Sequence, residues 1–302
     1  MKKTPVILDT DIGSDIDDTW AIAFMLRRPE IEVKLITTAT DNTAWRAELA
    51  AEILEVAGRA DIPVGIGFNP ANAAGRGWQR TFRPGYTLAD YPGTVHKDGV
   101  DALISTVMNA PEPVTIVCIG PLTNIGEALR REPRIASRAR FVGMHGSLRA
   151  AEDGRRMVVA EYNVVRDPAA AKTVFTAPWD ITITPLDTCG VVRLSGAAFD
   201  GLSESRDPLV RLCMHGHWTY MNSNEGVARS SVGRTSILFD TVAVYLAFAR
   251  EFTAIERLGV TVTDDGYTLI DAAGKQMDCA TQWSDLEGYK RFLCKSLEAR
   301  DR

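Results

Sequence analysis

Two kinds of apolar pattern alternate along much of the chain. One is a short continuous apolar run, and the other is a longer run with apolar residues at helical spacing. The short runs are typical of strands and the longer ones of helices. Strands are predicted at residues 5–8, 33–38, 62–66, 114–119, 140–144 and 181–185. Helices are predicted at residues 19–28, 44–57, 100–108, 122–130, 169–175 and 241–248.

This alternation predicts an α/β protein with a mostly parallel open sheet and helices on both faces, because a crossover helix between successive strands leaves them parallel. The run at 114–119 is almost continuously apolar, as expected for a strand buried on both faces. No repeat, low-complexity linker or change of composition marks a boundary. We therefore expect a single domain over residues 1–302.

Two stretches interrupt the alternation. Residues 68–96 are rich in Gly, Pro, Asn and Arg and also contain Trp78 and Phe82. A loop of this length inside a compact domain is usually functional or mobile. Residues 208–241 contain several His and aromatic side chains, followed by a patch rich in Gly, Ser and Arg.

Composition and charge limit the classes of partner. The chain has 302 residues, with 34 Lys and Arg against 39 Asp and Glu, and its net charge of −5 gives no reason to expect nucleic acid or an anionic membrane as partner. It has neither the roughly 20 apolar residues of a membrane-spanning helix nor the apolar core of a signal peptide, so a cytoplasmic location is expected. The 5 cysteines are widely spaced without a CxxC pair, which predicts reduced thiols.

Five carboxylates fall within ten residues directly after the first predicted strand. They are Asp9, Asp11, Asp15, Asp17 and Asp18. Ligands bind at this edge of parallel sheets, and like charges that converge there repel one another unless a cation or ligand hydroxyls compensate. Asp17 and Asp18 also suit a helix N-terminus, but that role leaves Asp9 and Asp11 unexplained. Since carboxylate oxygens favour Ca²⁺ or Mg²⁺, the cluster predicts a hard-cation site.

Three chemistries use acidic clusters of this kind. An EF-hand loop is excluded, because Trp20 stands where its last acidic ligand would be. Phosphoryl transfer through an aspartyl nucleophile and attack of metal-activated water on a sugar both remain open on these residues alone.

Further along the chain, several blocks join this cluster in a recognisable order. They are Asp9-Thr10-Asp11-Ile12-Gly13 with Asp17-Asp18-Thr19-Trp20-Ala21-Ile22; Ile36-Thr37-Thr38 followed by Asn42; Gly120-Pro121-Leu122-Thr123-Asn124-Ile125; Ala160-Glu161-Tyr162-Asn163 with Asp167-Pro168; Pro185-Leu186-Asp187; and Phe239-Asp240-Thr241-Val242-Ala243-Val244. Together they resemble the inosine–uridine-type nucleoside hydrolases over nearly the whole chain. The resemblance implies that family's Rossmann-like fold and makes an aspartyl phosphatase a minor alternative, because such an enzyme has no use for the later blocks.

The resemblance implies one Ca²⁺ at the bottom of a ribose pocket. Carried onto this chain, its ligands would be Asp11, Asp18, Asp240 and the backbone carbonyl of Ile119. Three carboxylates and a carbonyl leave coordination places for water and ribose hydroxyls. Asp11 would also act as the general base toward the attacking water.

The implied reaction is hydrolysis of the N-glycosidic bond of a nucleoside to free base and ribose, through an oxocarbenium-like transition state. The ribose hydroxyls would be held by Asp17, Asn42, Glu161, Asn163 and Asp240. A small-molecule nucleoside is the expected partner, and a homodimer or homotetramer the expected assembly. The alternatives are a hydrolase of another ribosyl compound and a non-catalytic ribose or nucleoside binder.

Three departures from the family pattern concern specificity. The first block has two extra residues, so either Asp15 or Asp17 would meet the ribose, and we take Asp17 because it adjoins the helix. Arg155 stands where the family often has Asn, which would suit an anionic or modified 5′ group. Phe239 stands where many members have a His that protonates the leaving base.

An aromatic residue before the last metal-binding Asp is shared with the purine-preferring branch of the family, which stacks the base between rings. Trp78 or Phe82 would supply the opposite ring, and His96 is a further candidate for contact with the base. A purine preference is therefore expected. The residues expected to form either a lid or only a helix face are His215, His217, Trp218, Tyr220 and Asn224.

Overall fold

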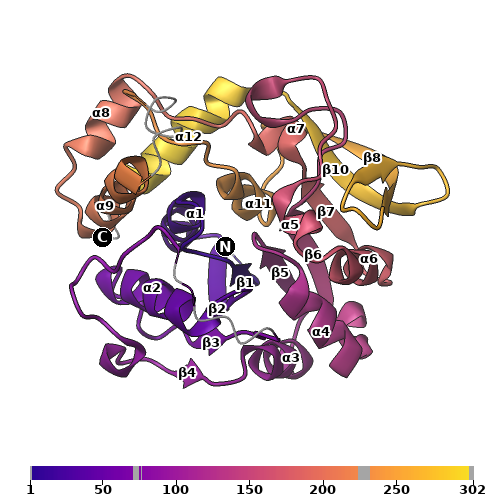
Figure 1. Ribbon diagram of the computed structural model, residues 1–302, viewed down its shortest axis with the longest axis horizontal. Coiled ribbons are helices and arrows are strands. Elements are labelled where there is room, and N and C mark those ends of the chain that lie inside the picture. Colours follow the sequence, from indigo (N-terminus) through magenta and orange to yellow (C-terminus); the bar gives the residue numbers. More distant parts are fainter. Residues whose placement is uncertain (1, 71–74, 76, 224–231, 299–302) are drawn as a thin grey trace.

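A single ten-stranded open sheet organises the protein. The computed structural model describes residues 2–70, 75, 77–223 and 232–298 (Figure 1). Its strands are β1 (Thr4–Thr10), β2 (Ile31–Thr38), β3 (Val64–Ile66), β4 (Val95–His96), β5 (Val114–Cys118), β6 (Ala139–Met144), β7 (Ile181–Thr184), β8 (Thr253–Val262), β9 (Thr268–Ile270) and β10 (Lys275–Trp283). They lie in the order β4-β3-β2-β1-β5-β6-β7-β10-β8-β9. Pairing is parallel from β4 to β10, whereas β8 is antiparallel to both β10 and β9.

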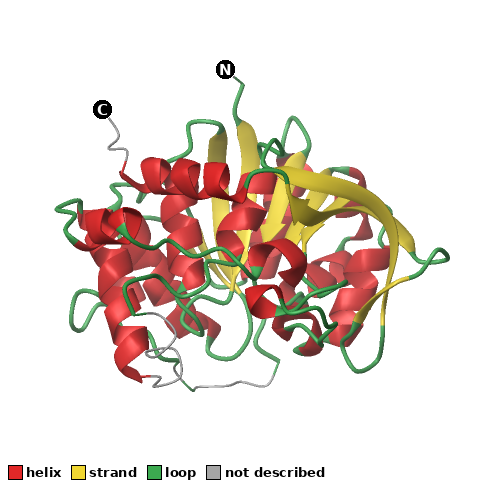
Figure 2. Ribbon diagram, turned by 90° about the horizontal axis from the view of Figure 1, so that it is seen from above, coloured by secondary structure: helices red, strands yellow, loops and turns green. Residues whose placement is uncertain are grey.

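Helices cover both faces of this sheet (Figures 1 and 2). They are α1 (Asp17–Leu26), α2 (Thr43–Val56), α3 (Gly99–Asn109), α4 (Thr123–Arg131), α5 (Tyr162–Val165), α6 (Pro168–Thr176), α7 (Leu186–Cys189), α8 (Ala197–Ser203), α9 (Pro208–Ser223), α11 (Asp240–Leu246) and α12 (Leu286–Glu298). The 3-10 turns in the described part of the chain are η1 (Leu88–Asp90), η2 (Pro133–Ser137) and η3 (Glu152–Gly154). One apolar core lies under α1, α2, α9, α11 and α12, and a second lies under α3, α4 and α6.

Helix α1 is the central helix of the first core. All ten of its residues are buried, including Trp20 and Phe24, because it packs against α2, α9, α11 and α12 as well as the sheet. A helix enclosed in this way needs apolar residues on every side, which explains the run from Ala21 to Leu26. The first turn of α1 is consequently held in a fixed position at the edge of the sheet.

The strand order reverses between β1 and β5. From β1 the sheet continues through β2, β3 and β4, and from β5 it continues through β6 and β7 in the opposite direction. The loops that follow β1 and β5 therefore leave the sheet toward opposite faces and open a crevice between them, which is where ligands bind in open α/β sheets. The acidic cluster lies in the loop after β1 and in the first turn of α1.

The α/β architecture predicted from the pattern is confirmed. Each predicted strand and helix between residues 5 and 185 coincides with an observed element of the same kind, apart from a few residues at the ends. Helix α9 contains four of the residues expected to form either a lid or a helix face, namely His215, His217, Trp218 and Tyr220. The β8, β9 and β10 ribbon and α12 were not predicted, because few of the β8 side chains are buried and the strand lacks a clear apolar alternation.

All five cysteines are buried and form no disulfide. Among the described residues, we find no helix whose length and apolar character would let it cross a membrane.

Candidate active site

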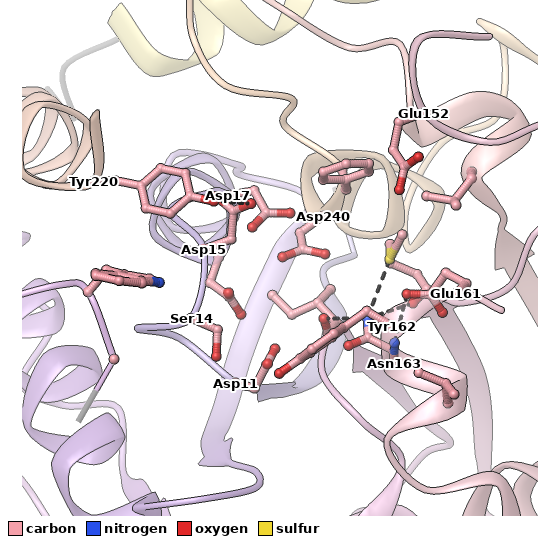
Figure 3. A pocket seen from close by; sticks show the side chains of 18 of the residues that line it. Asp11, Ser14, Asp15, Asp17, Glu152, Glu161, Tyr162, Asn163, Tyr220 and Asp240 are labelled. Carbon is pink, nitrogen blue, oxygen red and sulfur yellow. Dashed lines mark hydrogen bonds between the residues drawn. The ribbon is translucent and has the colours of Figure 1, made fainter. Parts of the chain in front are cut away.

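A cavity of about 640 Å³ opens at the carboxyl ends of β1 and β5. Its floor is formed by Asp11, Asp17 and Asp240 (Figure 3), and Asp18 and Ile119, the residue directly after β5, line the same cavity. Its opposite wall is formed by η3 and the start of α5, with Glu152, Glu161 and Asn163. The crevice predicted by the strand order is therefore the place where the acidic blocks meet.

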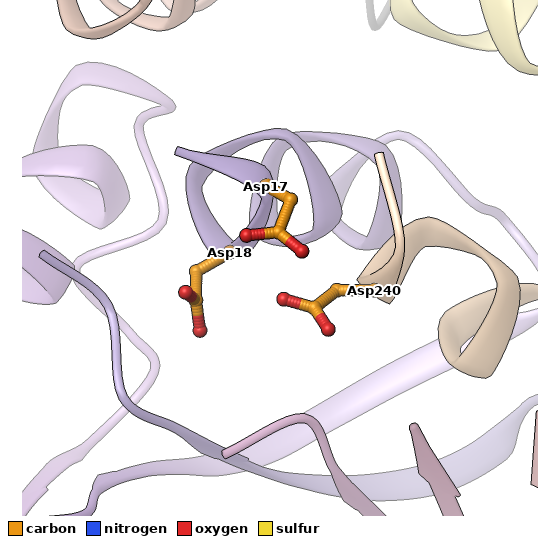
Figure 4. Close-up of side chains that lie close together, drawn as sticks. All are labelled: Asp17, Asp18 and Asp240. Carbon is orange, nitrogen blue, oxygen red and sulfur yellow. The ribbon is translucent and has the colours of Figure 1, made fainter. Parts of the chain in front are cut away.

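Three buried carboxylates form the most compact part of this floor. Asp17 and Asp18 lie in the first turn of α1, and Asp240 is the first residue of α11, which packs against α1. One carboxylate oxygen from each lies within 4.8 Å of the other two (Figure 4). Their residues are only 5%, 2% and 2% exposed. Burial, followed by the charges of neighbouring carboxylates, raises the pKa of all three well above its usual range.

A hard divalent cation fits this donor set. Oxygen ligands alone favour Ca²⁺ or Mg²⁺ over softer metals, and a divalent charge would remove the repulsion between the three carboxylates. Asp11 and the carbonyl-bearing residue Ile119 line the same cavity, so further oxygen ligands are close by. The sequence predicted Asp11, Asp18, Ile119 and Asp240 as ligands, and the geometry adds Asp17 to the compact group.

Asp9 lies behind the floor and does not line the cavity. Its carboxylate accepts hydrogen bonds from Thr37 Oγ1 and from Asn124 Nδ2, the latter at 2.7 Å. Burial raises the pKa of Asp9 to about 7, against the opposing effect of these two hydrogen bonds. Asn124 also donates to the carbonyl of Thr38, so Asp9 ties the end of β1 to β2 and α4.

Arg46, on α2, supports the loop that carries Asp11, and the sequence analysis did not identify it. Its side chain is 2% exposed, and all three guanidinium nitrogens donate hydrogen bonds. Nη1 donates to the carbonyls of Asp11 and Ile12, and Nε donates to the carbonyl of Thr40. Nη2 donates to Ser14 Oγ at 2.9 Å and to Asp41 Oδ2 at 3.2 Å. This positive charge opposes the rise that burial causes in the pKa of Asp11.

Replacing Arg46 with methionine is expected to lower the free energy of unfolding by about 3–5 kcal/mol, the usual cost of removing one partner from a buried charged network. The carbonyls of Asp11, Ile12 and Thr40 would lose their common donor. Urea denaturation measures the change. Arg166→Met is the matched control, because Arg166 also donates to Asp41 but is 40% exposed, and an exposed pair contributes at most about 1 kcal/mol. Equal losses in the two variants would contradict this role for Arg46.

The opposite wall presents an acceptor with no partner. Asn163 Nδ2 donates to the carbonyls of Ile119 and Met144, both at 3.0 Å, which fixes the orientation of the amide. Its Oδ1 is buried and has no hydrogen-bond partner among the described residues. Because Asn163 lines the cavity, this oxygen is available to a ligand that carries a donor.

Glu161 lies beside Asn163 at the start of α5. Its carboxylate accepts hydrogen bonds from three backbone N–H groups, those of Gly146 at 3.0 Å, Asn163 at 2.7 Å and Val164 at 3.3 Å. Burial nevertheless raises the pKa of Glu161 to about 7. The fixed carboxylate and the free amide oxygen of Asn163 thus face the acidic floor from the same wall (Figure 3).

Aromatic side chains line the outer part of the cavity. Trp78 from the long loop, Tyr162 from α5, Tyr220 from α9 and Phe239 before α11 contribute to it. Trp78 and Tyr162 are about half exposed, at 49% and 46%. Flat apolar faces above a polar floor suit a ligand with a sugar at one end and an aromatic ring at the other.

Three predicted site residues, Asn42, Phe82 and His96, are not among the residues that line this cavity. The Asn42 side chain caps α2 by accepting the N–H of Trp45. Phe82 packs edge-on against His215, with ring centres 5.3 Å apart, because Glu52 accepts its backbone N–H and holds this part of the loop against α2. His96 lies in β4, the edge strand of the sheet, where it pairs with Gly65.

Arg155 and the expected lid residues differ in how they relate to the cavity. Arg155 is exposed and donates to Glu152 Oε2 at 3.0 Å, and it is Glu152 that lines the cavity. The charged side chain of this pair that lines the cavity is thus a carboxylate, which does not favour an anionic 5′ group. Of the expected lid residues, Tyr220 lines the cavity, whereas His217 is buried against Phe199. Asn224 lies outside the described residues.

Sequence comparison identifies relatives of the chain. The family model described as inosine-uridine preferring nucleoside hydrolase matches residues 6–290. The chain is 35% identical over 198 residues to the non-specific ribonucleoside hydrolase RihC of Salmonella agona, and 34% identical over 198 residues to RihC of Salmonella newport. Each alignment covers 63% of both proteins, so the chain matches less than two thirds of the length of these curated relatives.

Solved structures of two nucleoside hydrolases superpose on nearly the whole chain. A plant nucleoside hydrolase, PpNRh1, superposes with a TM-score of 0.83 at 25% identity, covering 98% of this chain and 99% of that one. The purine-preferring ribonucleoside hydrolase from Gardnerella vaginalis has the same fold, with a TM-score of 0.78 at 22% identity over 97% and 98% of the two chains. Since the family model extends from β1 into α12, the chain belongs to the inosine-uridine preferring nucleoside hydrolase family.

Proposed function

We propose that the protein hydrolyses the N-glycosidic bond of ribonucleosides, with Ca²⁺ as its resident cation, and releases the free base and ribose. The observation that carries the proposal is the Oδ1 of Asn163, which has no hydrogen-bond partner within the described part of the chain and belongs to a residue that lines the same cavity as Asp17, Asp18 and Asp240. A ribose offers hydroxyl donors to such acceptors, and its cis hydroxyls also suit a hard cation. The names of RihC and of the plant enzyme support the same reaction class.

The cation would be held by Asp18 and Asp240, with Asp11 and the carbonyl of Ile119 as further ligands. Asp17 belongs to the same compact group of oxygens, so it is available either to the cation or to a ribose hydroxyl. When bound, Ca²⁺ would supply Lewis acidity and lower the pKa of a water molecule at the floor of the cavity. Glu161 and Asn163 would orient the ribose from the opposite wall.

In the proposed step Asp11 removes a proton from the attacking water. The water oxygen forms a bond to C1′ of the ribose while the bond from C1′ to the base nitrogen breaks, and the electron pair of that bond leaves with the base. Positive charge develops on the ribose ring in this transition state, and the surrounding carboxylates stabilise it. Asp11 suits the role of base because its side chain is 4% exposed, lines the cavity and has a pKa raised by burial.

We further infer that purine nucleosides are preferred. Phe239 precedes Asp240, and Trp78 lines the outer part of the same cavity, so two aromatic side chains are available to stack on a large base. Stacking makes a purine easier to protonate at its ring nitrogen, which compensates for the lack of a histidine at position 239. Turnover of uridine comparable to that of inosine would contradict this preference.

The proposed function is tested by assaying released reducing sugar from inosine, guanosine, adenosine, uridine and cytidine. We expect turnover with Ca²⁺, its loss with a chelator, and its recovery when Ca²⁺ is restored in excess. The same preparation with Mg²⁺ in place of Ca²⁺ tests the choice of cation. Calorimetric binding of nucleosides without any release of ribose would instead identify a non-catalytic binder and overturn the proposal.

A further inference from the structure

Asp15 stands apart from the other carboxylates of the cavity. It lies in the two-residue extension of the first block, and it does not belong to the group of oxygens formed by Asp17, Asp18 and Asp240. Its side chain nevertheless lines the cavity. Figure 3 places Asp15 and Tyr220 on one side of the cavity, with Glu161 and Asn163 on the other. Neither the proposed cation site nor the proposed ribose contacts on the opposite wall give Asp15 a contact with a ligand.

The extension joins two outer segments of the cavity. Tyr220 OH, on α9, donates to Asp15 Oδ2 at 3.2 Å. In the long loop, Gln79 Nε2 donates to the carbonyl of Asp15 at 2.9 Å, and the N–H of Trp78 donates to the carbonyl of Gly13 at 3.1 Å. Both aromatic residues that reach the cavity from these segments, Trp78 and Tyr220, are thus fixed to the same short loop.

Gly77 allows this close approach of the long loop. A Cβ atom at Gly77 would lie 2.1 Å from the carbonyl oxygen of Gly13, so a side chain there would force the two loops apart. The Asp15 carboxylate is consequently held between the Trp78 loop and α9 at a defined place on the wall. A carboxylate in this position accepts hydrogen bonds and has no donor of its own when ionised.

We propose that Asp15 is a specificity-determining residue that selects leaving groups with an N–H donor, by accepting a hydrogen bond from the edge of the base. The inference rests on the proposed function, since it concerns the part of the substrate that is released. Trp78 contacts the face of the ring, and Asp15 contacts its edge. Nucleobases with an amino group or a ring N–H fit this arrangement, and leaving groups without one do not use it.

The experiment compares Asp15→Asn with the wild type on pairs of substrates that differ in a single donor. The pairs are adenosine with purine riboside, and inosine with 1-methylinosine; 4-nitrophenyl β-D-ribofuranoside is a further substrate whose leaving group has no N–H. For the donor-bearing member of at least one pair, kcat/KM should fall about 10- to 100-fold, as expected for a weakened hydrogen bond to a charged group. For the donor-free substrates it should change less than about threefold. A ratio between substrates measured on one preparation is independent of the fraction that is folded.

Two controls separate the possible outcomes. Asp264→Asn removes the same charge from an exposed turn and should leave every ratio unchanged. Tyr220→Phe keeps the Asp15 carboxylate but removes the hydroxyl that holds it, so it should reduce the same discrimination in part. Equal losses for donor-bearing and donor-free substrates in Asp15→Asn would overturn the inference while leaving the proposed function intact. A wild-type protein that cleaves none of the five substrates would overturn both.

Discussion

Replacing Asp11 with asparagine is expected to lower kcat for nucleoside hydrolysis by a factor of about 10² to 10⁴, the usual contribution of a general base. Asparagine has nearly the same shape but cannot take the proton of the attacking water. The substitution should leave the loop in place, because Arg46 donates to the backbone carbonyl of residue 11 and not to its side chain. Steady-state kinetics with saturating nucleoside and Ca²⁺ measure the change.

The affinity for nucleoside separates catalysis from binding in this variant. Calorimetric titration of Asp11→Asn should give a dissociation constant within about tenfold of the KM of the wild type, since Asp11 is proposed to take its proton from the water and not from the nucleoside. Asp265→Asn, on an exposed turn, is the control for the loss of charge and should retain full activity. A decrease in kcat of less than tenfold in Asp11→Asn would assign the base to another carboxylate.

Asp240→Asn is expected to change the stability of the protein in opposite directions with and without a divalent cation. In a chelator, the variant should be more stable than the wild type by on the order of 2 kcal/mol, because it removes one of three like charges that are buried together. With Ca²⁺ at about a hundred times its dissociation constant, the wild type should gain about 2.7 kcal/mol and the variant much less. Thermal unfolding of both proteins in EGTA and in Ca²⁺ measures the two differences.

The decisive result is whether the difference in stability between Asp240→Asn and the wild type changes sign between EGTA and Ca²⁺. Asp200→Asn, which removes the same charge from the exposed side of α8, should respond to Ca²⁺ as the wild type does. If Ca²⁺ stabilises Asp240→Asn as strongly as the wild type, the cation binds elsewhere. If neither protein responds to Ca²⁺ or Mg²⁺, the three carboxylates do not form a cation site.

The sequence allowed most of the fold and the acidic floor to be predicted. The alternation of elements placed the first block at the carboxyl end of β1, and the family blocks brought Asp240 and Asn163 to the same cavity. The sequence alone could not separate the tasks of Asp15 and Asp17. That distinction depends on which way two neighbouring carboxylates point, and the structure shows one bonded to Tyr220 and the other beside Asp240.

Contacts between distant parts of the chain explain why sequence reasoning did not identify Arg46 and why Phe82 does not line the cavity. Arg46 occurs in a helix where an arginine ordinarily faces solvent, and only the packing of α2 beneath the first block buries it. Phe82 and Trp78 occur in the same loop, but the carboxylate of Glu52 turns the loop at Phe82 toward α2. Hydrogen bonds between residues so far apart in the chain cannot be predicted from a local sequence pattern.

The placement of the three clustered carboxylates has a consequence for biogenesis. Two of them belong to α1, whereas Asp240 lies more than 200 residues further along the chain and is synthesised much later. A nascent chain that lacks α11 therefore contains only part of the set, so the proposed cation would bind tightly only after α11 has packed against α1. Retention of Ca²⁺ by truncated or partly unfolded forms would thus report whether the two distant segments have come together.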